Sequence, residues 1–366
     1  MLQVPPDVFK VTHTPVRMVL RLLRADALEA HDRLQWDKLG GDAAAPSVFA
    51  EPWLMRCSLA HCDAQGAARL AVVEDESGRW LGVLPVVATR RQGRSPVPAW
   101  AAWRHPNQFV GAPLVRRGYA DDFWRRLVEG LGAHGQRVSL VLGKLPSDDP
   151  VTDALFRLCA AQRRGVIVDR RIARAFLDAD AAPAQCARQR SRLRGLERKL
   201  AGEVGPVAFA VARDAGQIDA FLALEQSGWK GRAGSALACA DRTQAFFREV
   251  CAEAAARDRL EVATLSAGGQ VIAVSIQLEG AGLRYGFKAA YDETFARCAP
   301  GLLLLDRLTQ HYVVRGGVGV DSCTVPEQQP VSRLWPGRRE LVDCRVALGG
   351  ATRGRLFAAM LACERA

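Results

Sequence analysis

Two stretches of this 366-residue sequence repeat the same order of strand, turn and strand, and this duplication constrains the fold more than any other feature. Residues 69–74 and 80–89 are typical of a β-hairpin with a turn at Gly78, and residues 259–265 and 271–279 of a second hairpin with a turn at Gly268. The hairpins lie 190 positions apart and align without a gap. VLGKLP, ending at Pro146, and DSCTVP, ending at Pro326, extend the match at an offset of 180. We therefore predict two copies of one α/β unit, the alternative being two unrelated units with common hairpins.

The remaining pattern predicts the elements around the hairpins. Apolar residues at helical spacing indicate helices over 16–39, 49–61 and 120–131 in the first copy and over 217–229, 241–257 and 301–315 in the second. Residues 137–145, 282–289 and 318–324 are typical of strands, and 100–115 is a strand-like stretch with tryptophan and proline. We place an N-terminal domain at 16–182, a basic connecting helix at 183–205, a C-terminal domain at 206–350 and a C-terminal helix at 351–366.

Composition limits the partners and the cellular setting. A net charge of +11 and a pI of about 9.5 favour phosphate-bearing cofactors, acidic polymers, nucleic acid or a membrane surface, without choosing among them. The ten cysteines form no C-x-x-C pair, which is typical of a reducing compartment and gives no complete set of metal ligands. The N-terminus lacks the pattern of a secretory signal, and no apolar run reaches the length of a membrane span. We expect a cytoplasmic protein without a metal; the sequence does not indicate its oligomeric state.

The segment 284–305, RYGFKAAYDETFARCAPGLLLL, is the strongest candidate for a functional site. It predicts a strand, a polar turn and a helix that opens at Pro300-Gly301. Free backbone N–H groups and the positive end of the helix dipole would meet at this turn, so the segment suits an anion. An ordinary strand–loop–helix connection would show the same spacing.

The predicted connecting helix is strongly basic. Against two acidic residues, Glu197 and Glu203, it carries six cations that wrap much of its surface: Arg188, Arg190, Arg192, Arg194, Arg198 and Lys199. Such a helix is suited to an anionic partner, although a solvated connecting helix has the same composition.

Several motifs resemble those of a known group of enzymes. WKGRAGSAL at 229–237, FKAAYDETFARCAPGLLLLDRL at 287–308, Asp321 and SRLWPGRR at 332–339 resemble the CelD/BcsL-like branch of GNAT-type acyltransferases. In the first copy, PSVFAEPWL and the W-R-H-P-N…G-A-P-L-V run at 103–115 resemble the same proteins. That branch is similar to the FemAB-like aminoacyl transferases. The resemblance implies an α/β fold of two tandem GNAT-like domains, each a mixed sheet with flanking helices. It also implies transfer of an acyl group from a thioester, most simply acetyl-CoA, to an amine or hydroxyl.

The resemblance also places the cofactor. GNAT-type proteins hold the pyrophosphate of acyl-CoA at a loop with an arginine or glutamine and spaced glycines. Here Arg297, Ala299, Pro300 and Gly301 occupy the corresponding place. Only one glycine is present, so binding would rest on Arg297 and on the N-terminus of the helix.

Acyl transfer needs a base for the acceptor, a polarised carbonyl and a proton for the leaving thiolate. We assign Asp292, with Glu293 beside it as an alternative, as the base that acts directly or through water. Tyr291 would be the acid, and Lys288 a contact to a cofactor phosphate or an acceptor carboxylate. A backbone N–H near Phe287 would polarise the carbonyl. Each residue also has a purely structural interpretation: Asp292 as a turn residue, Tyr291 as a packed ring and Lys288 as a solvated strand end.

Substrate contacts are expected from other segments. Trp229, Lys230, Gly231 and Arg232 form a loop that can fold over a substrate, with Trp229 on a sugar or adenine ring unless it anchors the core. Trp335, in a loop with Arg338 and Arg339, would gate the acceptor site or bind acidic groups. Asp321 is either a second acid–base group or the partner of an arginine, and His105 either faces the acceptor across the domain cleft or caps a loop.

Three functions fit these observations. The first is an acyltransferase that uses acyl-CoA and acts on a small molecule or saccharide, with envelope or exopolysaccharide metabolism as its setting. The second is a FemAB-like transferase dependent on aminoacyl-tRNA, which the basic helix favours and its short length opposes; a nucleic-acid partner is expected only in this case. The third is a non-catalytic protein that binds a polyanion or a saccharide.

Overall fold

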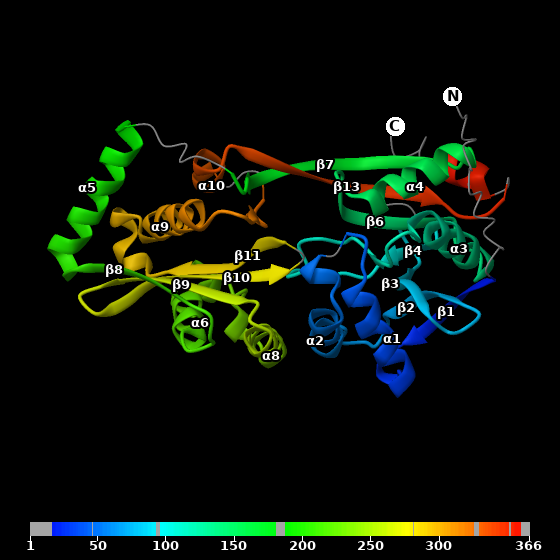
Figure 1. Cartoon of the computed structure of the whole chain (residues 1–366), viewed down its shortest axis with the longest axis horizontal. Helices are drawn as coiled ribbons and strands as arrows, with labels where there is room; N and C mark the ends of the chain where they lie inside the picture. The colour runs from blue at the N-terminus through cyan, green and yellow to red at the C-terminus, as the bar shows by residue number, and fades with distance from the viewer. Residues whose placement is uncertain are drawn as a thin grey trace, which may run out of the picture.

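The structure is a computed structural model, and it describes residues 17–45, 47–92, 96–180, 187–280, 282–325, 329–350 and 353–359. The chain forms two lobes that stand side by side and share one mixed sheet (Figure 1). The elements of the first copy are β1 (Met18–Arg24), α1 (Ala30–Gly41), α2 (Pro52–Cys62), β2 (Arg69–Asp75), β3 (Trp80–Thr89), β4 (Ala99–Ala102), β5 (Leu114–Val115), α3 (Ala120–Ala133), β6 (Ser139–Pro146), α4 (Pro150–Ala161) and β7 (Val166–Leu177).

The second copy follows the connecting helix α5 (Ala187–Val204). Its elements are β8 (Val207–Ala212), α6 (Ile218–Ser227), α7 (Trp229–Arg232), α8 (Asp241–Ala256), β9 (Leu260–Ala267), β10 (Gln270–Gly280), β11 (Leu283–Tyr291), η4 (Glu293–Cys298), α9 (Pro300–Arg315), β12 (Gly319–Asp321), α10 (Gln329–Leu334) and β13 (Gly337–Ala347). A short helix over 353–359 follows β13.

The order of the strands shows the duplication. It is β1-β2-β3-β4-β6-β13-β7-β12-β11-β10-β9-β8, so the two outer parts of the sheet mirror each other. In each copy a run of antiparallel strands ends at one parallel neighbour, β6 beside β4 and β12 beside β11. The two hairpins that the sequence aligned, β2–β3 and β9–β10, occupy equivalent places. The predicted α/β fold with a mixed sheet is therefore confirmed.

The last strand of each copy is exchanged with the other copy. β13 pairs with β6 of the first copy, and β7 pairs with β12 of the second. β7 and β13 also pair with each other from Gly337↔Phe176 to Val346↔Val166, and Figure 1 shows them running side by side across the two lobes. Each lobe is therefore completed by a strand of the other.

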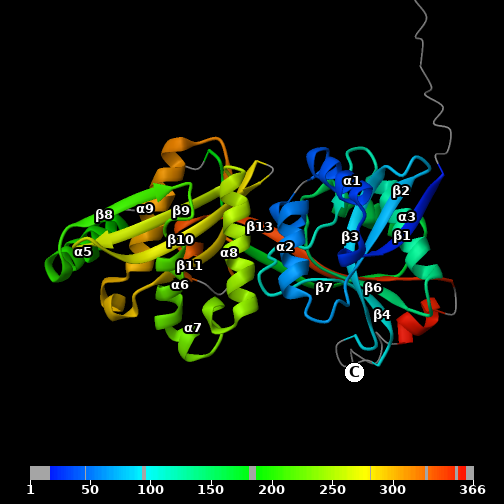
Figure 2. The same cartoon turned by 90° about the horizontal axis from the view of Figure 1, so that it is seen from below.

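Helices cover both faces of the sheet. In the second lobe α9 lies on one face and α6 and α8 on the other (Figure 1). Helix α2 of the first copy lies against α8 of the second (Figure 2), and Phe49 and Trp53 share a core with Phe246 and Phe247. The two lobes thus have a common apolar core as well as a common sheet.

Two predicted elements differ from the structure. Residues 18–24 form strand β1 and not the first part of a helix, because all seven residues pair with β2, and sheet pairing outweighs the local helical spacing. The stretch 100–115 is largely a loop between the short strands β4 and β5. Helix α4 and strand β7 were not predicted from the sequence. Of the helix expected at 351–366, residues 353–359 are helical and the remainder lies outside the described residues.

Candidate active site

Strands β11 and β12 diverge after a short parallel contact. They pair only from Leu283↔Gly319 to Tyr285↔Asp321, where β12 ends, while β11 continues to Tyr291. Gly286 marks the point of divergence, since a Cβ there would lie 2.7 Å from the carbonyl oxygen of Ser322. Beyond Tyr285 this edge of β11 has no strand partner among the described residues. Alternate N–H and C=O groups of the strand therefore face the opening.

The opening leads into a cavity of about 510 Å³. Its lining is mainly apolar and includes no carboxylate. The residues around it are Phe109, Trp229, Lys230, Val274, Ser275, Gln277, Gly286, Phe287, Lys288, Ala289, Ala290, Tyr291, Gly301, Leu304, Leu305, Leu308, Ser322, Cys323, Thr324, Val325, Val331 and Trp335. Six residues expected from the sequence to form the site are among them: Trp229, Lys230, Lys288, Tyr291, Gly301 and Trp335.

A β-bulge in β11 determines which residues reach each face of the sheet. Gln277 pairs with Gly286 and Ile276 with Lys288, so Phe287 is an extra residue on β11. Ile276 belongs to the core beneath α6 and α8, and Lys288 therefore lies on that face. Gln277 shares a face with Ala273, which packs with Leu304 and Leu308 of α9. The cavity thus passes from the α9 face of the sheet to the face that carries Lys288.

Lys288 is the central polar group of the cavity. Its Nζ lies 2.6 Å from Oδ1 of Asn107, which comes from the first copy. The same amine lies 5.7 Å from the ring centroids of both Phe109 and Phe287. Burial, and then the charge of Lys230, lower the pKa of Lys288 to about 8, against a smaller opposing effect of Glu225. A substantial fraction of this amine is therefore neutral near pH 8, as a general base requires.

The expected loop 229–232 is the short helix α7 at the mouth of the cavity. Its Trp229 side chain is 60% exposed, and Tyr291 close by is 39% exposed. Lys230 Nζ lies 2.7 Å from Oε1 of Glu225. Two groups of α7 are held by Glu293, which accepts from the backbone N–H of Trp229 at 2.8 Å and from Arg232 at 2.6 Å. Hydrogen bonding to Arg232 lowers the pKa of Glu293. Gly231 packs within α7 and does not line the cavity.

Asp292 lies next to the cavity but does not line it. Its Oδ1 accepts from the backbone N–H of Thr294 at 2.9 Å and from the hydroxyl of Thr294 at 2.6 Å. The carboxylate thereby caps the first turn of η4. This is the turn-closing arrangement that the sequence allowed as an alternative to a base.

The expected phosphate loop forms the start of α9. Ala299 adopts a left-handed conformation with φ of 50°, and its carbonyl accepts from Leu302 and Leu303 at 3.0 and 3.1 Å. Pro300 has no N–H. The first backbone donor of α9 is therefore the N–H of Gly301, which has no partner among the described residues. Gly301 alone of these residues lines the cavity. Arg297 points elsewhere and pairs with Glu203 of α5 at 3.1 Å.

Asp321 and His105 are buried outside the cavity. Asp321 accepts from Arg339 at 2.8 Å and forms a closer ion pair with Arg174, so it joins the exchanged strands β7 and β13 to β12. His105 lies 3.1 Å from the hydroxyl of Ser58, between the rings of Trp103 and Phe246. Burial, with smaller effects of Lys288 and Lys144, lowers the pKa of His105 to about 4. Its imidazole is therefore neutral at physiological pH.

Trp335 forms part of the wall between α9 and α10. It is buried, and its indole N–H donates to the hydroxyl of Thr309 at 2.8 Å. With Leu304, Leu308 and Val331 it makes one side of the cavity apolar. The indole is held in place as a wall, which a mobile gate would not require.

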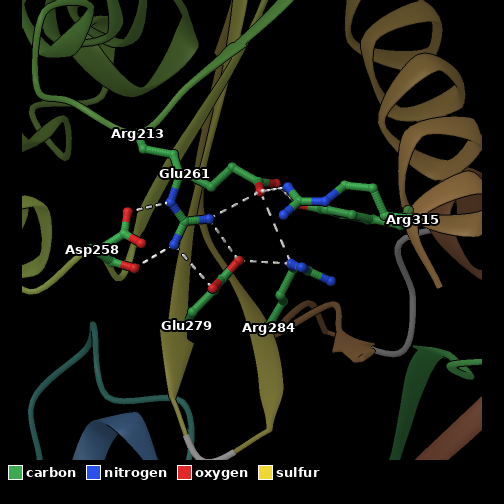
Figure 3. Close-up of polar contacts among 7 residues, drawn as sticks. Arg213, Asp258, Glu261, Glu279, Arg284 and Arg315 are labelled. Atoms are coloured by element: carbon green, nitrogen blue, oxygen red, sulfur yellow. Dashed lines mark hydrogen bonds and ion pairs between the residues drawn. The ribbon is translucent and has the colours of Figure 1, made fainter. Parts of the chain in front are cut away.

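A charged cluster fixes the other end of β11 and α9. It comprises Arg213, Asp258, Glu261, Glu279, Arg284 and Arg315 (Figure 3). Glu261 is fully buried and lies 3.3 Å from Arg315 of α9, while Glu279 lies 2.9 Å from Arg284 of β11 and 3.1 Å from Arg213. These contacts tie α9 to β9, β10 and β11 at the end of β11 that is remote from the opening.

Some residues of the site were not predicted from the sequence. Asn107 and Phe109 reach it from the first copy, far from Lys288 in the chain, and no local pattern links them. Gln277 lies on β10 with its side-chain Nε2 donating to Ser275 at 2.7 Å, while its buried Oε1 has no partner within the described chain. Alternation along β10 predicts that Gln277 faces one side of the sheet but not that this side is hollow.

Neither a metal site nor a membrane-spanning helix is evident in the part of the chain that the structure describes. No group of three or more His, Cys, Asp or Glu side chains there is arranged to hold a metal ion. None of the described helices is long and apolar enough to cross a membrane.

Comparison with known proteins agrees with this geometry. Residues 187–328 match the family model of the acetyltransferase (GNAT) domain. The matched region runs from α5 past β12 and includes Lys288, the bulge and the start of α9. Phe109, Val331 and Trp335, which also line the cavity, lie outside it. No curated protein matches the chain.

Solved structures show the same fold over both copies. FemX superposes with a TM-score of 0.53 at 9% identity, covering 86% of this chain and 95% of that one. L-PGS from Bacillus licheniformis gives 0.51 at 13% identity, covering 91% and 96%. A conserved protein of unknown function from Bacteroides thetaiotaomicron gives 0.54 at 11%, covering 87% and 97%. Identities this low establish a shared fold only.

Proposed function

We propose that the protein is an acyltransferase that moves an acyl group from a thioester donor, acetyl-CoA or a related acyl-CoA, to an amine or hydroxyl. The observation that carries the proposal is the unpaired edge of β11 beside Lys288 in one cavity. Together they supply N–H donors for a carbonyl and a base for an acceptor. The GNAT match over 187–328 supports the reaction class.

The residues on the α9 face fit the arm of an acyl-CoA. The orphaned Oε1 of Gln277 would accept a hydrogen bond from an amide N–H, and the free β11 edge would pair with the amides of an extended chain. Leu304 and Leu308 provide an apolar wall. At the start of α9, the N–H of Gly301 and the helix dipole would face a phosphate. When bound, the donor supplies an activated acyl carbon.

The protein's own groups then act from two sides. A free N–H of β11 near the bulge at Phe287 stabilises the developing oxyanion. Neutral Lys288, on the opposite face, takes the proton of the attacking amine or hydroxyl as the new C–N or C–O bond forms. The C–S bond breaks, and the Tyr291 hydroxyl, on the α9 face, gives its proton to the leaving thiolate. We assign the base to Lys288 and not to Asp292, because the Asp292 carboxylate is engaged with Thr294 and does not line the cavity.

The acceptor is best described as a saccharide or a similar small ring-bearing molecule. Trp229 and Tyr291 present exposed aromatic surface at the mouth, on which a sugar ring can stack. The resemblance of the motifs around Trp229 and Trp335 to CelD/BcsL-like proteins supports the same class and an exopolysaccharide setting.

Thermal-shift titration with acetyl-CoA and longer acyl-CoAs tests the donor site. We expect stabilisation by about 3 kcal/mol at one hundred times the dissociation constant. Ala289→Trp, which fills the cavity from β11, should remove the shift. Ala210→Trp on the exposed side of β8 is the matched control and should keep it. No shift with any acyl-CoA in the wild-type protein would reject this donor and leave aminoacyl-tRNA as the donor, or non-catalytic saccharide or polyanion binding, as the alternatives.

One observation favours aminoacyl-tRNA as a second candidate donor. The six cations of α5 are all exposed, and its two acidic residues are engaged, Glu197 with Arg307 at 2.6 Å and Glu203 with Arg297 at 3.1 Å. Leu193 and Leu200 are buried, so α5 presents charge without an apolar face for a membrane. If tRNA is the donor, anisotropy with labelled tRNA should show salt-dependent binding that Arg194→Glu with Arg198→Glu abolishes. Binding that survives both changes would exclude α5.

A further inference from the structure

The loop 103–113 of the first copy closes the opening that duplication would otherwise create there. β4 and β6 pair in parallel only from Ala99↔Ser139 to Ala101↔Val141, as β11 and β12 do. The gap beyond is filled. The N–H of Gly111 donates to the carbonyl of Lys144 at 3.0 Å, and a Cβ on Gly143 would lie 2.5 Å from the guanidinium of Arg104. The first copy therefore has no room for a ligand at this position.

The same loop reaches across into the second copy. Its backbone is fixed where Lys144 donates to the carbonyl of Gln108 at 3.1 Å and Arg174 to that of Phe109 at 2.8 Å. Asn107, which is 8% exposed, comes directly before the first anchor, and the side chain of Phe109, the second anchor, lines the cavity. Asn107 is the only asparagine in the sequence. Its Oδ1 contacts Lys288 Nζ at 2.6 Å.

We propose that Asn107, supplied by the first copy, is the positioning residue that holds the Lys288 amine at the cavity through a neutral acceptor. The chemical role of Lys288 rests on the proposed function, whereas the contact between Asn107 and Lys288 does not. An amide oxygen accepts from an amine or an ammonium group and adds no charge, whereas a carboxylate in its place would keep the lysine protonated. The other titratable groups that face Lys288 are Lys230, Glu225 and His105, the last of them neutral.

Two substitutions separate this role from general support of the loop. Asn107→Asp keeps the size of the side chain and adds a negative charge, so it should raise the pKa of Lys288 by about one unit or more. Asn107→Leu also keeps the size but removes the acceptor, so it should lower that pKa. Shifts in opposite directions cannot arise from damage to the loop, which would move both variants the same way.

The experiment titrates Lys288 directly. Competitive labelling of lysines with acetic anhydride from pH 6 to 11, read by mass spectrometry, gives the titration midpoint of Lys288, with exposed Lys199 as reference in the same digests. Circular dichroism and thermal melts show whether each variant is folded. If Asn107→Leu does not fold, Asn107→Ser replaces it, which keeps an acceptor too short to reach and should also lower the midpoint.

The outcomes are distinct. Opposite shifts at Lys288 with Lys199 unmoved support the proposal. An unchanged midpoint, or shifts in the same direction, overturns the proposal whatever the acyl-transfer rates of the variants are. The acyl-transfer rate against pH is then measured in the same variants. If the labelling midpoint shifts while the rate profile stays in place, Asn107 positions Lys288 but Lys288 is not the base, and the proposed mechanism fails on its own.

Discussion

Lys288 is a partly buried lysine that combines two properties. It lies at a cavity in contact with aromatic rings and an amide, and its pKa of about 8 lies well below the ordinary value of 10.5. Burial favours the neutral amine, and the positive charge of Lys230 adds to this effect. The chemistry of the site therefore depends on the surroundings of one side chain more than on the presence of several acids and bases.

The first prediction concerns the pH dependence that Lys288 imposes. The rate of acyl transfer should rise with pH to a plateau, with a midpoint near 8, because only the neutral amine accepts the proton. Lys288→Met should lower the rate by about 100-fold or more and remove this dependence. The folded state releases the proton near pH 8 and the unfolded chain near 10.5, so the unfolded state binds more protons in between. The free energy of unfolding should therefore rise with pH over this interval, relative to Lys288→Met.

Stopped-assay rates and urea denaturation of both proteins between pH 6.5 and 10.5 provide the measurement. Comparison within the pair removes contributions from cysteines and tyrosines that titrate in the same range. An acid limb that persists in the Lys288→Met variant would show that another group is the base. Lys199→Met, a change at an exposed position of α5, serves as the control and should alter neither curve.

At the scale of single residues, sequence reasoning located one wall of the site and missed the other. Lys288, Tyr291 and Gly301 follow one another along a strand, a turn and a helix, so a local pattern identifies them. Asn107 and Phe109 reach the cavity through the contact between the two copies. Gln277 lines the cavity only because β12 ends at Asp321 and leaves the sheet open there. These contacts arise from tertiary structure, and no pattern of residue spacing in the sequence indicates them.

At the scale of elements, the exchanged strands β7 and β13 depend on one buried group of charges. Asp321 of β12 is fully buried and contacts Arg174 of β7 and Arg339 of β13. Arg174→Met should lower the free energy of unfolding by about 3 kcal/mol, because it leaves the buried carboxylate with Arg339 as its only cationic partner among those two, beside the backbone N–H of Cys323. Replacing both Arg174 and Asp321 by apolar residues should cost less than the sum of the two single changes. Chemical denaturation of the double-mutant cycle measures the coupling, and simple additivity would contradict it.

The same elements show where local pattern is insufficient. Hairpins β2–β3 and β9–β10 were identified because each is contiguous in sequence and closed by a glycine turn. Strand β1 was mistaken for part of a helix, since its charged and apolar residues alternate irregularly and its strand conformation comes from pairing with β2. Strand β7, with exposed residues 169–171 in its middle, shows neither alternation nor a continuous apolar run. Its place between β13 and β12 depends on the other copy.

At the scale of the whole molecule, duplication has led to a division of roles. Both copies keep the short parallel contact that opens the sheet, but loop 103–113 fills the opening of the first. The first copy instead supplies Asn107 and Phe109, strand β7 and the α2 surface that packs against α8. The equivalent places of the two hairpins indicate two similar units, and the cavity described above lies at the opening of the second.

This division predicts that the second copy is incomplete on its own. A fragment of residues 183–366 would lack β7, leaving edges of β12 and β13 unpaired, and would expose the α8 side chains that α2 covers. We expect it to show no cooperative thermal transition and no stabilisation by acyl-CoA. Co-expression with residues 1–182 should restore both, with the two fragments purifying together, because the missing strand and the Asn107 loop are then supplied in trans. A lone fragment that melts cooperatively and responds to acyl-CoA would show that the first copy is dispensable, and would remove Asn107 from the site.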